Sequence, residues 1–418
     1  MGLRLHRHRT RTPPLEHRAG DGQVPGLQRG SARTTTCRVA VRRDTIAASG
    51  GAVVFSCSLG IASVAVPLLA LRAGYSPAEV GVLIALSAVA QMGARLGMGA
   101  WMRRLPDWTF VLSAAVLLGV SNLMAALTTA VVPFALALLL QGVSRAFFWT
   151  GSQTHVVRGD RSAVGALATV NLAAAVGLLI GPVVAGLVGA RSLPNALAAA
   201  AVLAGLACIP ALLLDRLPPF SPPVDRVPGR IWRRPGVDAG CWAGVSSGAW
   251  RGLLGSYVPV ALEHARQSAP TIGVLVSVAN LAQLAGSGLV GRLAGRGLVR
   301  AFAAGTLTGG LGTAAMGLVA DDAILAGVAL AVSGLGAGAL QTVGPAVATD
   351  AVHPEERGEA IAATGAFRAA ALLVAPLGTA AVVTVAPVGL ALALGGLLIV
   401  GPAAFTRSLA AHVRDRRS

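Results

Sequence analysis

Long apolar segments separated by short polar ones run along most of the chain. Twelve of them reach the length of about twenty residues that crosses a bilayer as a helix. They cover residues 45–71, 78–100, 109–129, 131–154, 164–189, 194–214, 238–262, 271–291, 299–319, 322–349, 359–383 and 387–408. The pattern predicts an all-α membrane protein with twelve transmembrane helices.

The segment Gly60–Gly99 returns 192 residues later as Gly252–Gly291. Eleven of the forty positions are identical without any gap, the pairs Pro67/Pro259 and Gln91/Gln283 among them. Composition alone would give roughly four matches. The chain is therefore predicted to contain two similar halves in the same order, which is the plan of many secondary transporters.

A proline-rich, basic segment, residues 215–237, separates the sixth apolar segment from the seventh. It is predicted to be a cytoplasmic central loop between two six-helix bundles, residues 44–214 and 238–410. Residues 1–43 hold ten arginines and few apolar residues, so they are predicted to be a disordered basic tail. Residues 411–418 are expected to form a second, short cytoplasmic tail.

Composition supports the membrane class. Hydrophobic residues make up 54% of the 418 and charged residues 12%, and the mean hydropathy is +0.70. The net charge of +17 raises the possibility of nucleic acid as a partner, but the arginines lie in the gaps between apolar segments, which argues against it. The four cysteines show no metal-ligand spacing, and no metal, cofactor or disulfide framework is expected.

The distribution of arginine predicts the orientation of the chain. The two tails and the even-numbered loops hold 27 of the 34 arginines, while the odd-numbered loops hold three. Loops rich in arginine stay on the cytoplasmic side, so both termini are expected to be cytoplasmic. The sequence thus predicts a multi-pass protein of the cytoplasmic (inner) membrane. It does not determine the oligomeric state, for which a monomer in the lipid bilayer is the expectation.

The fifth apolar segment carries a recognisable motif. Gly177 is followed by three apolar residues, Gly181-Pro182, two valines and Ala185-Gly186. This resembles the helix-five motif of the major facilitator superfamily, typical of its antiporter branches, with Ala185 in place of one glycine. Small residues let helices approach closely and Pro182 bends the span, so Gly177, Gly181 and Pro182 are expected to take part in conformational change.

Two loops resemble the gating motif of the same family in part. Gly99, Arg103 and Arg104 follow the second segment, and Gly291 and Arg296 follow the eighth. In the family an aspartate in this motif helps to hold the cytoplasmic gate shut, but here arginine replaces it in the first loop and the second lacks it too. Asp107, shifted by four residues, is one candidate replacement.

The family resemblance implies that spans one, four, seven and ten line a central cavity. The fourth span also contains Gln141-Gly142, similar to a family helix-four motif, although the arginine expected just before this pair is absent. Polar and aromatic residues that share a helix face on these spans are the candidates for substrate binding. They are Gln141, Arg145, Trp149, Ser246, Trp250, Arg251, Tyr257 and Gln341.

Arginine inside a bilayer is costly and calls for a water-filled cavity, a partner or a function. Arg251 is expected to face the cavity, whereas for Arg145 ligand contact and a structural role stay open. Arg368 is expected to be structural, and Arg95 to reach the inner headgroups. Buried arginines without a buried acid favour a substrate with an anionic group.

No aspartate or glutamate lies deeper than the end of a span. If protons are coupled to transport, Asp44, Glu263 and Asp350 are the candidates at the cavity mouths, with His155 as a further one.

The sequence therefore predicts a secondary transporter that moves a small molecule across the cytoplasmic membrane by alternating access, as an efflux antiporter. Uptake or facilitated passage of an anionic metabolite is an alternative, and a non-transporting receptor or scaffold is another. Nothing resembles a catalytic nucleophile with its base or a phosphate-binding loop, so an enzyme is not expected.

Overall fold

The computed structural model describes residues 30–159, 163–219, 231–290, 297–352 and 357–405. Two units are distinguished, Met1–Val41 and Arg42–Ser418. In the first unit the described residues are helical and belong to the beginning of helix α1 (Gly30–Arg72). All further description concerns the second unit.

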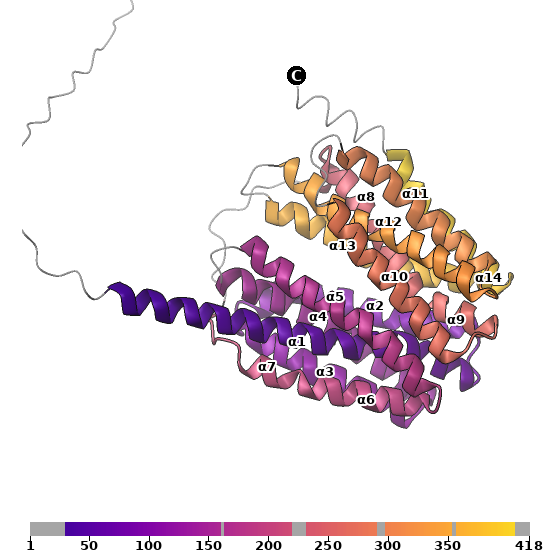
Figure 1. The fold of residues 1–418 in the computed structure, drawn as a ribbon, viewed down its shortest axis with the longest axis horizontal. Coiled ribbons are helices and arrows are strands. Elements are labelled where there is room, and N and C mark those ends of the chain that lie inside the picture. The colour runs from indigo at the N-terminus through magenta and orange to yellow at the C-terminus, as the bar shows by residue number, and fades with distance from the viewer. Residues whose placement is uncertain (1–29, 160–162, 220–230, 291–296, 353–356, 406–418) are drawn as a thin grey trace, which may run out of the picture. The chain divides into compact units, whose positions relative to one another are not determined.

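The second unit is all-helical, as the sequence predicts, and its helices form two groups (Figure 1). Its N-terminal group comprises α1 from Arg42 on, α2 (Pro77–Trp101), α3 (Asp107–Leu127), α4 (Val131–Gly159), α5 (Ala163–Gly189), α6 (Leu193–Leu206) and α7 (Cys208–Leu212). Its C-terminal group comprises η1 (Ile231–Arg233), α8 (Val237–Leu254), α9 (Tyr257–His264), α10 (Ala269–Val290), α11 (Gly297–Leu318), α12 (Ala323–Asp350), α13 (Arg357–Val383), α14 (Val388–Val400) and η3 (Gly401–Phe405). We call these groups the N-bundle and the C-bundle.

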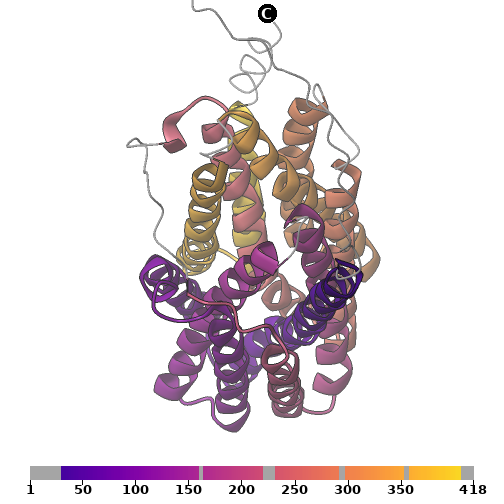
Figure 2. The same cartoon turned by 90° about the vertical axis from the view of Figure 1, so that its left-hand side faces the viewer.

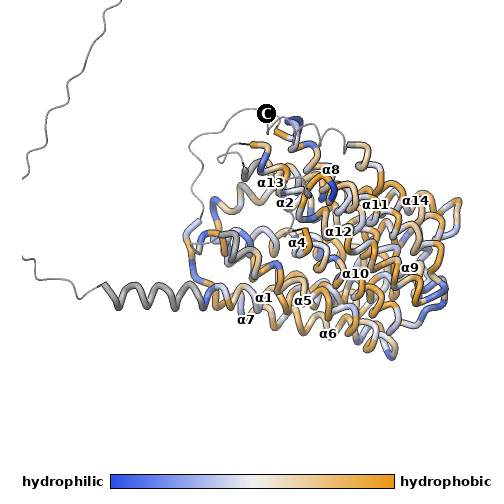
Figure 3. The backbone as a smooth tube through the Cα atoms, turned by 45° about the horizontal axis from the view of Figure 1, so that its top comes forward, coloured by the Kyte–Doolittle hydropathy of each residue, from blue (hydrophilic) through white to orange (hydrophobic). Residues whose placement is uncertain are grey.

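In the part of the chain that the structure describes, nine helices are long and apolar enough to cross a membrane. Three predicted spans are helical but are too short or too weakly apolar to be counted among these nine. Residues 238–262 are divided between α8 and α9, α14 has 13 residues, and α11 is rich in glycine and threonine. The hydropathy drawn in Figure 3 is hydrophobic along the helices and hydrophilic at many of their connections.

Helix α1 begins well before the apolar segment that predicts it. It starts at Gly30, so residues 30–43 of the tail predicted over residues 1–43 are helical here, and residues 1–29 lie outside the described residues. Residues 31–43 contain neither proline nor glycine, and alanine and arginine favour helix. The helix of the membrane span therefore meets no helix-breaking residue as it continues toward the N-terminus.

Two spans predicted to be continuous are broken, each by a proline. Proline has no backbone N–H, so the carbonyl four residues earlier loses its helical donor. Helix α6 ends at Leu206, four residues before Pro210, and the break after α8 lies at Gly255, four residues before Pro259. A proline thus follows each break by four residues, although Pro67, the repeat equivalent of Pro259, lies inside the unbroken helix α1.

The internal repeat reappears as matching backbone geometry. Gly74, in the turn after α1, has φ 95°, and Arg266, at the equivalent position after α9, has φ 61°. The serine two residues later caps the next helix in both copies, because the Ser76 hydroxyl accepts from Glu79 N and the Ser268 hydroxyl from Thr271 N, both at 3.3 Å. The two turns are therefore one structure used twice, with glycine in the left-handed position of only one copy.

A second repeated feature is the close approach of a glycine to a proline. A Cβ atom on Gly60 of α1 would lie 3.0 Å from Pro182 Cδ of α5, and one on Gly252 of α8 would lie 3.2 Å from Pro376 Cδ of α13. Each proline-containing helix thus lies against a glycine of the first helix of its own bundle. Pro182 of the helix-five motif is the residue that α1 contacts in this way.

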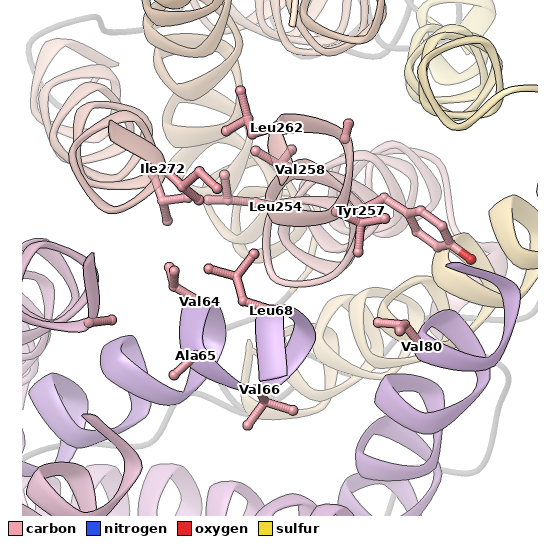
Figure 4. Packing of buried hydrophobic residues seen from close by; sticks show 14 of the residues in the cluster. Val64, Ala65, Val66, Leu68, Val80, Leu254, Tyr257, Val258, Leu262 and Ile272 are labelled. Atoms are coloured by element: carbon pink, nitrogen blue, oxygen red, sulfur yellow. The ribbon is translucent and has the colours of Figure 1, made fainter. Parts of the chain in front are cut away.

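The bundles contact each other at one end of the spans. We call this the odd-loop end; it carries the connections 73–76, 128–130, 190–192, 265–268, 319–322 and 384–387, and the opposite end is the even-loop end. Figure 2 views the helices from the even-loop side. Val64 and Leu68 of α1 lie opposite Leu254 and Ile272 in one continuous buried cluster (Figure 4).

Polar contacts reinforce this junction. Arg72 Nε at the end of α1 pairs with Glu263 Oε1 of α9 at 2.9 Å, and the Tyr257 hydroxyl donates to Pro77 O of α2 at 3.0 Å. Helix α5 also packs against α10, and α2 against α13. The N-bundle and C-bundle are therefore held together at their odd-loop ends.

The repeated turn generates a prediction about stability. A non-glycine residue in the left-handed region costs about 1–2 kcal/mol, and glycine avoids this cost. Gly74→Ala should therefore lower the free energy of unfolding by about 1 kcal/mol, whereas Arg266→Gly should raise it by up to about 1 kcal/mol. Denaturant titration in detergent measures both. A loss of stability in Arg266→Gly equal to that in Gly74→Ala would contradict the matched-turn interpretation.

Candidate functional site

Four arginines lie inside long helices of the two bundles: Arg95 in α2, Arg145 in α4, Arg251 in α8 and Arg368 in α13. They lie near enough for their charges to interact, since Arg145 repels Arg251, and Arg251 and Arg95 repel Arg368. We call these four residues the arginine centre. It combines two helices of each bundle.

Arg145 and Arg368 lie far from the ends of α4 and α13, whereas Arg251 is in the last turn of α8. Among the described residues, no acidic side chain pairs with the centre. At 1.5 Å per residue, Arg145 is about 21 Å from the first residue of α4. Each of the four side chains is half-buried. Among the described residues, the ion pairs found join Arg72 to Glu263, His155 to Asp44 and Asp107, and Arg158 to Asp107, so none involves the centre.

Two guanidinium groups of the centre are incompletely satisfied. The Nε atoms of Arg145 and Arg368 are buried and have no hydrogen-bond partner among the described residues. A buried donor without a partner costs free energy, and more so when the group is charged. Both groups therefore have hydrogen-bonding capacity that a bound molecule could use.

Two amide side chains contact the guanidinium groups, and a third contacts one of these amides. Arg251 Nη1 donates to Asn280 Oδ1 at 2.6 Å, and Arg368 Nη2 lies 3.4 Å from Gln341 Oε1. The same oxygen of Gln341 accepts from Gln283 Nε2 at 2.7 Å. Gln341 is exposed and Asn280 is buried. The centre thus offers positive charge together with neutral hydrogen-bonding groups.

The structure brings together only some of the residues that the sequence predicts to bind substrate. Arg145 lies near Arg251, and Gln341 contacts Arg368. Ser246 and Trp250 point into the C-bundle instead: Ser246 Oγ donates to Ile399 O at 2.9 Å and Trp250 Nε1 to Ser333 Oγ at 3.1 Å. Both are almost fully buried, and these contacts lie within the C-bundle.

The other predicted binding residues also lie elsewhere. Tyr257 belongs to the junction at the odd-loop end, where its side chain reaches toward α2 (Figure 4). Trp149 packs against Phe148 with ring centroids 5.6 Å apart, in a cluster of N-bundle residues. Gln141 is buried, and no contact with the arginine centre is found for it.

Sequence reasoning missed four members of this site. Arg368 was expected to be structural and Arg95 to reach the headgroups, but both adjoin the other arginines. Asn280 and Gln283 were not among the candidates. A lone asparagine in the middle of an apolar span and a glutamine identical in both repeats were the available signals.

The predicted gating residues are placed as follows. Gly177 and Gly181 of α5 lie against the backbone of α1 between Val53 and Ile61. Gly99 is in the last turn of α2, and Arg103 and Arg104 are exposed in the turn that follows. Gly291 and Arg296 lie outside the described residues.

The three candidates for proton coupling lie in different surroundings. Glu263 pairs with Arg72 at the odd-loop end, and Asp350 is exposed at the end of α12. Asp44 is buried at the even-loop end, where Asp44 Oδ2 lies 2.9 Å from His155 Nε2. None of these contacts joins a carboxylate to the arginine centre.

Asp44, Asp107, His155 and Arg158 form a second polar group, which we call the His155 cluster. His155 Nδ1 lies 3.0 Å from Asp107 Oδ1, and Arg158 Nη1 lies 3.1 Å from Asp107 Oδ2. A neutral imidazole donates through one nitrogen only, so carboxylates at both nitrogens are satisfied when the ring carries both protons. The four groups then balance to zero net charge.

The His155 cluster also holds the chain that leaves the N-bundle. Asp44 Oδ1 accepts from Asp215 N at 2.9 Å, and Arg158 Nη2 donates to Pro218 O at 2.6 Å. Asp107 therefore binds partners in α4 of its own bundle. No contact of Asp107 with Arg103 or Arg104 of the gating motif is found among the described residues, so the structure does not support Asp107 as a replacement for the missing aspartate.

Comparison with known proteins identifies the family. The model of the Major Facilitator Superfamily matches residues 48–242 and 240–417, which is most of the chain. No curated protein matches the sequence.

Solved structures of low sequence identity share the fold. A POT family transporter in complex with 5-aminolevulinic acid has a TM-score of 0.70 at 12% identity, with 90% of this chain and 96% of that chain covered. A nucleoside transporter has a TM-score of 0.69 at 13% identity, with coverage of 88% and 98%. A bacterial homologue of the human lysosomal transporter Spinster, in an inward-facing and unoccupied conformation, has a TM-score of 0.63 at 12% identity, with coverage of 90% and 96%.

The His155 cluster generates a prediction about stability. His155→Leu leaves Asp44 and Asp107 buried with one partner fewer, and loss of one member of a buried charged group costs about 3–5 kcal/mol. The variant should therefore unfold at a clearly lower denaturant concentration in detergent. His264→Leu is the matched control, because His264 is exposed and bonds only to Val260 O through Nδ1 in the described residues. Equal stability of the two variants would show that the cluster contributes little.

Proposed function

Since the chain belongs to the Major Facilitator Superfamily, and is therefore a secondary transporter and not an enzyme, we propose that its substrate is a small organic anion. The observation that carries this proposal is the arginine centre: four guanidinium groups from both bundles and no acidic partner among the described residues. The anion binds between the bundles and crosses the membrane as they alternate.

Electrostatics supports this choice of substrate. Transfer of one ion from water into a protein interior costs several kcal/mol after relaxation, and mutual repulsion among the arginines adds to that cost. A cationic substrate would increase the repulsion, and a neutral one would leave it unchanged. An anion offsets it, so the free centre favours binding of negative charge.

The donors at the centre suit carboxylate or phosphate groups. Guanidinium groups bind both in a bidentate manner, and such charge-assisted hydrogen bonds are about twice as strong as neutral ones. The buried Nε atoms of Arg145 and Arg368 are available to donate to such a group. The neighbouring amides of Gln283 and Gln341 would supply neutral hydrogen bonds to the uncharged part of the substrate.

We propose export as the direction. The helix-five motif around Gly181-Pro182 is typical of antiporter branches, and the arginine distribution favours cytoplasmic termini in the cytoplasmic membrane. A potential that is negative inside also drives an anion outward, by about 2.3 kcal/mol per charge at 100 mV. Protons that exchange for the substrate would bind at Asp44, Glu263 or Asp350, and the transporter would act as a monomer.

Uptake of an anionic metabolite is the second candidate, because the same arginine centre would serve it. It must overcome the membrane potential, so it requires coupling to protons or to another gradient. Flux measured in vesicles of both orientations, with and without a pH gradient and a potential, separates the two. Outward flux that persists without a pH gradient and follows the potential would favour export as an anion.

The anion proposal makes a direct mutational prediction. Loss of one charged hydrogen bond costs about 1.5–3 kcal/mol, so Arg251→Ala should raise the half-saturation concentration of the transported anion roughly 10- to 100-fold. Flux is measured in proteoliposomes over a panel of mono- and dicarboxylates, aromatic carboxylates and sugar phosphates. Arg191→Ala, at an exposed position of the odd-loop end, is the matched control.

Two results would contradict the proposal. One is saturable transport of a neutral or cationic compound with no transport of any anion in the panel. The other is anion transport that Arg251→Ala leaves at the level of the control, with equal amounts of inserted protein.

A further inference from the structure

Pro182 leaves one carbonyl of α5 without its helical partner. In a helix the N–H of residue 182 would donate to the carbonyl of residue 178, but proline has no N–H. The structure fills this gap from the other bundle, because Asn280 Nδ2 of α10 donates to Leu178 O at 3.0 Å. An acceptor created by the helix-five motif is thus satisfied by a side chain of the C-bundle.

The other end of the same amide contacts the arginine centre. Asn280 Oδ1 accepts from Arg251 Nη1 at 2.6 Å. Guanidinium can only donate and a backbone carbonyl can only accept, so these two partners fix the orientation of the amide without ambiguity. Asn280 therefore links Arg251 in the C-bundle to the carbonyl of Leu178 in the N-bundle.

We propose that Asn280 couples occupancy of the arginine centre to the contact between the two bundles; this inference rests on the proposed binding of an anion at Arg251. In the free protein Arg251 holds Asn280 in the orientation that donates to Leu178 O. A bound anion is a stronger acceptor for Arg251 than a neutral amide. Arg251 then turns from Asn280 to the anion, Asn280 loses its fixed orientation, and the contact between α5 and α10 weakens.

Ser277 provides a matched comparison on the same helix. One turn before Asn280, Ser277 Oγ donates to Leu179 O of α5 at 2.7 Å. Its hydroxyl thus makes the same kind of contact between the bundles, and no contact with an arginine is found for it in the described residues. Loss of Ser277 should weaken the junction of the bundles but leave its response to the anion intact.

A substitution at Pro182 tests the hydrogen bond from Asn280 to Leu178 O. Alanine at this position restores an N–H, which can donate to Leu178 O within α5 and make the bond from Asn280 redundant. The effects of Pro182→Ala and Asn280→Ala on the junction should then be smaller together than their sum. Residues that share a partner show this non-additivity in double-mutant cycles.

The experiment measures the distance between the bundles at the odd-loop end. Spin labels are placed at Arg191 of the N-bundle and Asp321 of the C-bundle, both exposed, in a full-length background without native cysteines. The protein is reconstituted in lipid nanodiscs, and the distance distribution is recorded by pulsed electron resonance with and without citrate, an anion that offers three carboxylates. Citrate binding is measured on the same samples by calorimetry.

In the protein with an intact Asn280, citrate should increase the population with separated odd-loop ends. Asn280→Ala should raise this population before citrate is added, and should reduce the citrate-induced change roughly fivefold or more while citrate still binds. Ser277→Ala should also raise the initial population but keep the citrate-induced change. Asn280→Asp, which loses the donor to Leu178 and places a carboxylate beside Arg251, should also raise the initial population but should weaken citrate binding.

Each failure has its own meaning. A citrate response in Asn280→Ala equal to that in Ser277→Ala would overturn the coupling role while leaving the anion site in place. Additive effects of Pro182→Ala and Asn280→Ala would overturn the role of the Leu178 carbonyl. If neither citrate nor any carboxylate or phosphate of the flux panel binds to the protein with intact Arg251, the proposed function fails and the coupling role fails with it.

Discussion

The positive charge in the middle of the spans is the constraint on which the rest of the structure depends. Arg145, Arg251 and Arg368 repel one another in part, and each would be costly in an apolar surrounding. Two helices of each bundle contribute to the group, so the charge can exist only where the bundles face each other. The proposal of an anionic substrate rests on this location, because an anion would offset the repulsion among the arginines.

The packing at the odd-loop end complements this centre. Apolar residues of α1, α9 and α10 form one buried cluster there, and Arg72 pairs with Glu263 at its rim. Exposed ion pairs contribute only about 0–1 kcal/mol, so apolar contact dominates the junction. A junction of modest strength is useful in a transporter that alternates, since the binding energy of a small ligand must suffice to open it.

Acidic residues are separated from the arginine centre by the architecture. Asp44 and Asp107 lie at the even-loop end and are neutralised by His155 and Arg158 within the N-bundle. This group ties α1, α3 and α4 to Asp215 and Pro218, where the chain leaves the bundle. The acids of this cluster thus have partners within the N-bundle, and none of their ion pairs involves the arginine centre.

The sequence by itself determined the helices, the repeat and the positions of prolines and arginines. Bilayer thickness fixes the length and hydropathy of each span, and proline removes a backbone donor wherever it stands. Helical periodicity gave the face on which each polar residue lies, but not which helix lies opposite. Only the tertiary structure therefore decided that Arg368 joins Arg251, that Trp250 faces Ser333 instead, and that Asn280 supplies the donor missing at Leu178, since each contact joins residues on different helices.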